Sequence, residues 1–72
     1  MKKGVEYFSY NVKWLRNLNG FTQTELSIRL KCTRSIIGAY EEGRSEAKFE
    51  MLIKMADLFN VSIDDLLRKK IK

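Results

Sequence analysis

The stretch that decides the fold is TQTELSIRLKCTRSIIGAYEEGR, residues 22–44. It predicts two short helices joined by a tight turn, and the second helix opens on Thr33, Arg34 and Ser35. Short polar and basic side chains at the start of a short helix are the kind that reach base edges in the DNA major groove. The stretch therefore makes DNA binding the leading functional hypothesis.

Capping residues mark where these two helices begin and end. Thr22 and Glu25 have the spacing of a capping box, in which the threonine hydroxyl accepts from the Glu25 backbone N–H and the glutamate side chain reaches back. Thr33 is a second N-cap candidate, and Gly43 ends the second helix because glycine readily adopts a positive φ. The helix pair is expected to span about residues 22–42.

Three further amphipathic helices are predicted on either side of this pair. They cover about residues 5–18, about residues 48–59, and a short segment beginning at Ser62. The expected buried stripes are Phe8, Val12, Leu15 and Leu18 in the first, and Phe49, Leu52, Met55, Ala56 and Phe59 in the second. With no proline and only four glycines, the 72 residues predict one all-α, five-helix domain covering residues 1–72.

The composition excludes several classes of function. Cys32 is the only cysteine and there is no histidine, so an internal disulfide and a zinc site are both excluded, and nothing suggests a cofactor. A histidine-free chain without a glycine-rich phosphate loop gives little support to an enzyme. Its longest apolar runs are only a few residues, so no membrane span or signal peptide is expected. A reducing cytoplasm is the expected location.

The net charge of +5 is unevenly distributed along the chain. Residues 1–34 carry a net charge of +5, residues 35–67 carry −4, and the tail 68–72 adds +4. A basic first half suits a surface that faces phosphates, although ordinary solvated charge would produce the same total.

A set of residues that extends over nearly the whole chain carries a family resemblance. The set is Leu15-Arg16, Gly20-Phe21-Thr22-Gln23, Glu25-Leu26, Leu30, Thr33-Arg34-Ser35, Ile37, Tyr40-Glu41, Gly43-Arg44, Leu52, Ala56, Val61-Ser62 and Asp65-Leu66-Leu67. At these separations it resembles the Xre-type helix-turn-helix family, the small five-helix domains related to phage Cro and repressor proteins. The resemblance implies a lambda-repressor-like fold and a transcriptional regulator, typically a repressor, that binds double-stranded DNA sequence-specifically.

The resemblance also implies roles for individual residues. The base-facing positions would be Thr33, Arg34 and Ser35, followed one turn later by Gly38 and Ala39. Phosphate contacts fix the register of a protein on DNA, whereas base contacts carry the sequence information.

The implied contacts to the DNA backbone come from two places. Thr22 and Gln23 would lie beside a phosphate at the start of the first helix of the pair. The loop Glu42-Gly43-Arg44 would offer its backbone N–H groups and the Arg44 guanidinium to another. Family members also commonly join the residues equivalent to Arg16 and Glu41 in an ion pair that orients the recognition helix, although both could be ordinary exposed charges.

The sequence departs from the family pattern at the turn and in the recognition helix. Lys31 stands where the family usually has glycine, and lysine at a positive φ costs about 1 kcal/mol relative to glycine. Gly38-Ala39 supplies no polar side chain where family members often read bases. Close approach to DNA with Ala39 on a thymine methyl, or simple tight packing, would both account for it. Direct readout is therefore expected to depend mainly on Arg34.

A second apolar stripe in the first helix raises the question of protein partners. Tyr7, Tyr10 and Trp14 are spaced i, i+3, i+7 beside the expected core stripe. They would form a partner interface, or be covered by the N-terminal arm or by the last helix with Ile71. A homodimer is expected, because one small module buries too little DNA surface for high specificity. The alternative function is an antitoxin-like module that binds a toxin through this stripe and uses DNA binding for autoregulation.

Overall fold

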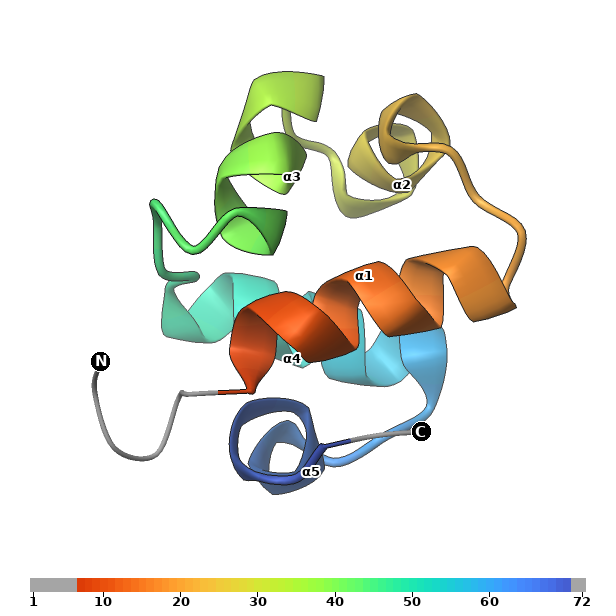
Figure 1. Ribbon diagram of the computed structural model, residues 1–72. Coiled ribbons are helices and arrows are strands. Elements are labelled where there is room, and N and C mark those ends of the chain that lie inside the picture. Colours follow the sequence, from red (N-terminus) through yellow and green to blue (C-terminus); the bar gives the residue numbers. More distant parts are fainter. Residues whose placement is uncertain (1–6, 71–72) are drawn as a thin grey trace.

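The computed structural model describes residues 7–70 and contains five helices and no strand over that range (Figure 1). The helices are α1 (Phe8–Leu18), α2 (Gln23–Leu30), α3 (Arg34–Glu41), α4 (Phe49–Phe59) and α5 (Ile63–Arg68). The all-α, five-helix prediction is confirmed. The expected start of the first helix near Val5, the residue Ile71 and both ends of the expected domain 1–72 lie outside the described residues.

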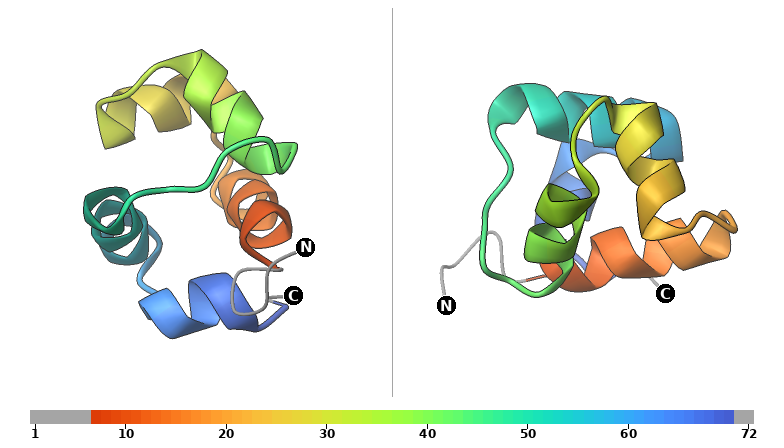
Figure 2. Two further views of the ribbon diagram at one scale, coloured as in Figure 1. Left: turned by 90° about the vertical axis from the view of Figure 1, so that its left-hand side faces the viewer. Right: turned by 90° about the horizontal axis from the view of Figure 1, so that it is seen from above.

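The hydrophobic core lies between the two longest helices, α1 and α4. α1 and α4 lie on opposite sides of it, α2 and α3 close one end, and α5 closes the other (Figures 1 and 2). The core side chains are Phe8, Val12, Leu15, Leu26, Leu30, Ile37, Tyr40, Leu52, Met55, Phe59 and Leu66. α2 and α3 therefore form one exposed layer, carried on a base made of the other three helices.

Three of the helices begin after a threonine or serine whose hydroxyl accepts a hydrogen bond from the backbone of the first turn. The Thr22 hydroxyl accepts from the Glu25 N–H at 3.0 Å, and the Glu25 carboxylate accepts from the Thr22 N–H at 2.7 Å, so the capping box is present. Thr33 caps α3 and Ser62 caps α5 by accepting from the backbone N–H three residues later. These caps satisfy donors that the first turn of a helix leaves without partners.

The first four helices end in the same way, with a residue in the left-handed region. These residues are Gly20, Lys31, Gly43 and Asn60, with φ between 58° and 76°. At each end the following N–H donates back to a carbonyl five residues earlier, as from Phe21 to Arg16 at 3.0 Å. This arrangement is the Schellman motif, and it satisfies the last carbonyls of each helix.

Two residues expected in the buried stripes are exposed instead. Leu18 is 64% exposed and Phe49 is 67% exposed. At about 100° per residue, Phe49 lies roughly 85° away from the centre of the arc formed by Leu52, Met55 and Phe59. Phe49 is the first residue of α4, and Leu18 is the last residue of α1 and lies at the edge of the buried arc of that helix. Both predictions of burial are wrong because each residue is at a helix end and at the margin of its stripe.

A buried polar residue that the sequence did not reveal joins α1 to α5. Asn11 is 0% exposed, and its side-chain amide donates to the carbonyls of Asp65, Leu66 and Lys69 at 3.3, 2.8 and 2.6 Å. These carbonyls are at the end of a six-residue helix, where backbone donors run out, and within residues 7–70 only that of Asp65 also accepts from a backbone N–H, that of Lys69 at 3.4 Å. Asn11 therefore takes the place of a C-cap for α5.

None of the helices within residues 7–70 is long and apolar enough to cross a membrane.

Candidate nucleic-acid interface

The N-terminus of α3 is the most exposed part of the helix pair. Thr33, Arg34 and Ser35 are all exposed, and the Thr33 hydroxyl is occupied as the cap of α3 by accepting from the Ile36 N–H at 3.2 Å. The helix is held from behind by Ile37 and Tyr40, which are in the core. The three residues expected to face bases thus share one accessible helix end, and within residues 7–70 the side chains of Arg34 and Ser35 make no hydrogen bond.

Gly38 and Ala39 are both buried, although Gly38 has open space where a Cβ would lie. Ala39 is only 6% exposed, because it lies on the side of α3 that faces the molecule, so its methyl group is not available to a base. The expectation that Ala39 faces bases is therefore corrected. Gly38 follows Arg34 by four residues, and a Cβ added there would have no heavy atom within 4 Å. Its position lies on the same helix face as Arg34 and is not needed for close packing inside the protein.

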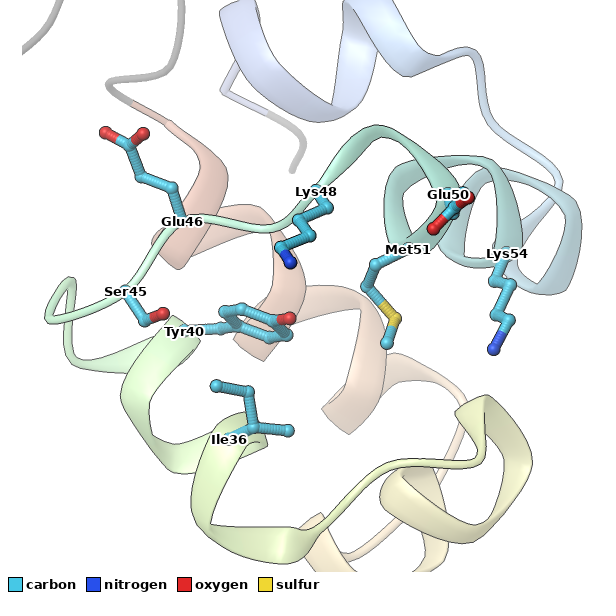
Figure 3. A pocket seen from close by; sticks show the side chains of 8 residues that line it. All are labelled: Ile36, Tyr40, Ser45, Glu46, Lys48, Glu50, Met51 and Lys54. Atoms are coloured by element: carbon cyan, nitrogen blue, oxygen red, sulfur yellow. The ribbon is translucent and has the colours of Figure 1, made fainter.

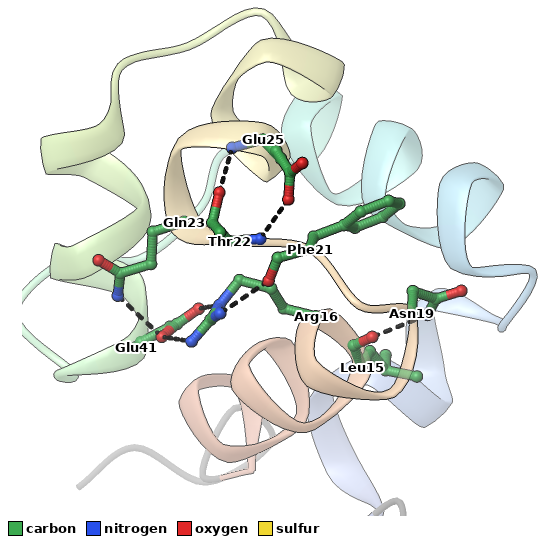
Figure 4. Close-up of polar contacts among 8 residues, drawn as sticks. All are labelled: Leu15, Arg16, Asn19, Phe21, Thr22, Gln23, Glu25 and Glu41. Carbon is green, nitrogen blue, oxygen red and sulfur yellow. Dashed lines mark hydrogen bonds and ion pairs between the residues drawn. The ribbon is translucent and has the colours of Figure 1, made fainter.

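Behind α3, three side chains from three helices form one network (Figure 4). The Arg16 guanidinium of α1 donates to both carboxylate oxygens of Glu41 on α3, at 2.6 and 3.1 Å, and to the Phe21 carbonyl at 2.9 Å. The two side chains are 12% and 4% exposed, so this is a largely buried, bidentate ion pair. It fixes the end of α3 against α1.

Gln23 is the third member of that network. Its amide donates to Glu41 Oε1 at 3.0 Å, and the side chain is only partly exposed. The sequence suggested that Gln23 is a free phosphate ligand, whereas here it also ties the start of α2 to α3. Of its two N–H donors, one is engaged by Glu41, which leaves the other for a group outside the protein.

The loop after α3 differs from the expectation. The N–H groups of Glu42, Gly43 and Arg44 donate to the carbonyls of Gly38, Tyr40 and Ala39 at 3.0, 3.2 and 2.9 Å. They complete the Schellman motif of α3 and are not available to a phosphate, which corrects that expectation. The Arg44 guanidinium donates to the Glu42 carboxylate at 2.7 Å, and both side chains remain exposed. Arg44 can still reach a phosphate, but Glu42 competes for it.

A cleft of about 280 Å³ opens between α3 and the start of α4 (Figure 3). Its lining residues are Ile36, Tyr40, Ser45, Glu46, Lys48, Glu50, Met51 and Lys54. In Figure 3 the Lys48 ammonium points over the Tyr40 ring, and the Glu46 carboxylate points away. Lys48 is an exposed cation beside α3 that was not among the site residues predicted from the sequence. Its only sequence signal is a lysine just before α4.

The Cys32 thiol, at the turn between α2 and α3, and the Tyr40 hydroxyl both have raised pKa values. Burial raises the pKa of the Cys32 thiol, and the nearby positive charge of Lys54 opposes that effect. A raised pKa keeps the thiol protonated and unreactive near neutral pH. Burial likewise raises the pKa of Tyr40. Within residues 7–70 no group of three or more acidic or cysteine side chains is placed to hold a metal ion.

This helix pair and its arrangement agree with a known family. A family model described as helix-turn-helix matches residues 12–66. The chain belongs to the helix-turn-helix family. The match covers all but the first turn of α1 and nearly all the rest of the core, so it includes every element that positions α3.

Two curated relatives and one solved structure illustrate the likeness. The HTH-type transcriptional regulator YqaE of Bacillus subtilis is 36% identical over 61 residues, which are 85% of this chain and 53% of that protein. The regulator MJ0272 of Methanocaldococcus jannaschii is 33% identical over 55 residues, 76% of this chain and 83% of that protein. The structure of SinR, a master regulator for biofilm formation, in complex with DNA has a TM-score of 0.75 at 20% identity, covering 82% and 95% of the two chains.

The names and lengths of these relatives limit what the comparison shows. Both curated proteins are named as uncharacterized helix-turn-helix-type transcriptional regulators. The chain spans about half the length of YqaE. At 20% identity, the likeness to SinR is one of fold.

Proposed function

We propose that this domain binds double-stranded DNA sequence-specifically as a transcriptional regulator, with α3 in the major groove. The observation that carries the proposal is the exposed end of α3, where Thr33, Arg34 and Ser35 project from a helix that the Arg16–Glu41 pair holds in place. The DNA complex of SinR, which has the same fold, supports this use of the helix pair. A pre-fixed helix loses little conformational entropy on binding.

In this proposal base reading depends on Arg34. A guanidinium can donate two hydrogen bonds to O6 and N7 of guanine, worth about 1–3 kcal/mol of discrimination against the wrong base. Thr33 and Ser35 would assist, and Gly38 would let the helix backbone approach the bases without a side chain between them.

The proposed phosphate contacts lie on both sides of α3. Thr22 and Gln23 mark the start of α2, where the unpaired N–H groups of the helix favour an anion. Arg44 lies beyond the end of α3, and Lys48 is a further candidate beside the cleft. Such contacts add affinity without sequence preference.

The test is a fluorescence-anisotropy titration against the duplex upstream of the gene, with mixed-sequence competitor, from about 50 to 200 mM salt. Tight binding that falls steeply with salt and survives competitor is expected, because cations displaced from the phosphates are released on binding. Arg34→Ala should lose the preference over competitor. Arg68→Ala is the matched control, because Arg68 is also an exposed arginine but is on α5, where it pairs with Asp64. No preference for any duplex would contradict the proposal.

We further propose that the domain acts in the cytoplasm as a homodimer that represses transcription by occupying its operator. Exposed apolar side chains on α4, Phe49 and Ile53, support a self-contact. The exposed charges of that helix alternate in sign, with Lys48, Glu50, Lys54 and Asp57, so an antiparallel second copy can pair them. In vitro transcription with the upstream template should show fewer transcripts as protein is added, and an increase would indicate activation.

A second candidate function is an antitoxin-like module that binds a protein toxin. The observation that favours it is Tyr10, which is 40% exposed on α1 while Tyr7 and Trp14 beside it are half-buried. Toxin binding of this kind should be weakened by Trp14→Ala and unaffected by Arg34→Ala. DNA recognition should respond in the opposite way, so the two variants separate the two functions.

A further inference from the structure

One apolar stripe of α1 is not used by the DNA-binding layer. It consists of Tyr7, Tyr10, Trp14 and Leu18, spaced i, i+3, i+7, i+11, and we call it the aromatic face. Tyr10 and Leu18 are 40% and 64% exposed, while Trp14 packs partly against the core. The Tyr7 N–H donates to the Leu67 carbonyl at 3.3 Å, which fixes one end of the stripe to α5. The aromatic face is therefore held in place by α5 and by the core.

The aromatic face lies on the α5 side of α1. Tyr7, Trp14 and Leu18 are four residues before, three after and seven after Asn11, whose amide donates to the carbonyls at the end of α5. Arg16, in contrast, points from α1 to Glu41 of α3. In Figure 1 α5 and the α2–α3 layer lie on opposite sides of α1. A partner on the aromatic face would leave the end of α3 accessible.

Within residues 7–70 the charged side chains nearest to Tyr10 are basic. Residues 7–21 contain no acidic side chain. Lys13 is exposed three residues after Tyr10, and the Lys70 ammonium lies 5.0 Å from the centre of the Tyr10 ring. The acidic residues of α5 are already paired, Asp64 with Arg68 at 3.4 Å and Asp65 with Lys69 at 3.3 Å. The rim near Tyr10 therefore carries positive charge that no ion pair within residues 7–70 balances.

This charge selects among the partners that an apolar face can take. A second copy placed on the same face would bring Lys13 and Lys70 against like charges, which is unfavourable. An anionic lipid surface fits the charge, but Trp14 is partly buried, and the most exposed apolar side chain, Leu18, is at the end of the face away from Lys70. An acidic protein segment satisfies both the rim and the apolar stripe.

We propose that the aromatic face binds an acidic amphipathic helix of another protein. Apolar residues of that helix, spaced i, i+3 or i+4 and i+7, would cover Tyr10, Trp14 and Leu18, and its carboxylates would pair with Lys13 and Lys70. The proposal gives the partner of the second candidate function a specific chemistry. It rests on that function only in using the same surface of α1. It does not depend on DNA binding, which the face leaves free.

The chain contains its own reporter for this contact, because Trp14 is its only tryptophan. The probe is an 18-residue helical peptide without aromatic residues, with leucines at the stated spacing and glutamates on both flanks. A matched peptide carries lysine in place of every glutamate. Covering Trp14 should shift its emission to shorter wavelength with the glutamate peptide, and the lysine peptide should bind at least about tenfold more weakly.

Two variants and a control test the site. Lys13→Glu should abolish the preference between the two peptides, because the new carboxylate offsets the Lys70 charge, and Tyr10→Ser should weaken the glutamate peptide at least about fivefold. Ile28→Ser removes an exposed side chain of α2, 69% exposed, and should change nothing. Circular dichroism melting of each variant shows that it is folded, and anisotropy with the operator duplex should be unchanged in all three.

Each contrary result has a distinct meaning. Equal binding of both peptides, or equal weakening by Ile28→Ser, would refute the proposal. An emission shift caused by phosphatidylglycerol vesicles but not by the glutamate peptide would assign the face to lipid. Concentration-dependent association lost in Tyr10→Ser would assign it to a second copy. Failure of the unsubstituted protein to bind any duplex would refute the DNA-binding function and leave the peptide result intact.

Discussion

Lys31 shows at the scale of one residue how the turn between α2 and α3 is built. Its φ is 59°, in the left-handed region, and the next N–H, that of Cys32, donates to the Ser27 carbonyl at 2.9 Å. Glycine is the usual residue at this position of a Schellman motif because it has no Cβ to strain. Lys31→Gly should therefore raise the free energy of unfolding by about 1 kcal/mol, measured by urea denaturation. Lys13→Gly, within α1, should lower it by about 1 kcal/mol. A loss of stability in both variants would show that the turn is not strained.

Glu41 has its effect at the scale of whole helices, because it holds α1, α2 and α3 together. Its carboxylate accepts from Arg16 and from Gln23 and is almost fully buried. Glu41→Gln would leave the Arg16 guanidinium without its counter-charge and should cost about 3 kcal/mol of unfolding free energy. The same variant should weaken operator binding at a temperature where it remains folded, since α3 and Gln23 lose their common anchor. Glu42→Gln, in the exposed neighbouring pair with Arg44, should cost little stability. Equal effects of the two variants would show that the buried pair does not position α3.

The elements were predictable from the sequence to the extent that local signals define them. The capping box at Thr22, the cap at Thr33 and the turn at Gly43 depend on neighbours within a few residues, and the helices follow them. What could not be predicted depends on contacts between distant segments. The Asn11 amide donates to carbonyls more than 50 residues away in the sequence, and the Gln23 amide donates to Glu41 on α3. Ala39 was expected at the bases because family members often read bases from that position, but in this chain the packing of α3 buries it.

At the scale of the whole molecule, the exposed Phe49 and Ile53 on α4 provide a test of the proposed homodimer. Burying two apolar side chains on each of two copies removes the largest exposed apolar groups of that helix from water, which favours association. Phe49→Ser together with Ile53→Ser should shift the protein from dimer to monomer in sedimentation velocity, at a concentration where the unsubstituted protein is a dimer. Operator affinity should fall by at least about tenfold, because one domain then binds each half-site alone. Ile28→Ser removes a similarly exposed side chain from α2 and should leave the dimer intact. If the double variant remains dimeric while Ile28→Ser dissociates, the two copies meet through α2, and the spacing of the half-sites has to be derived from that contact.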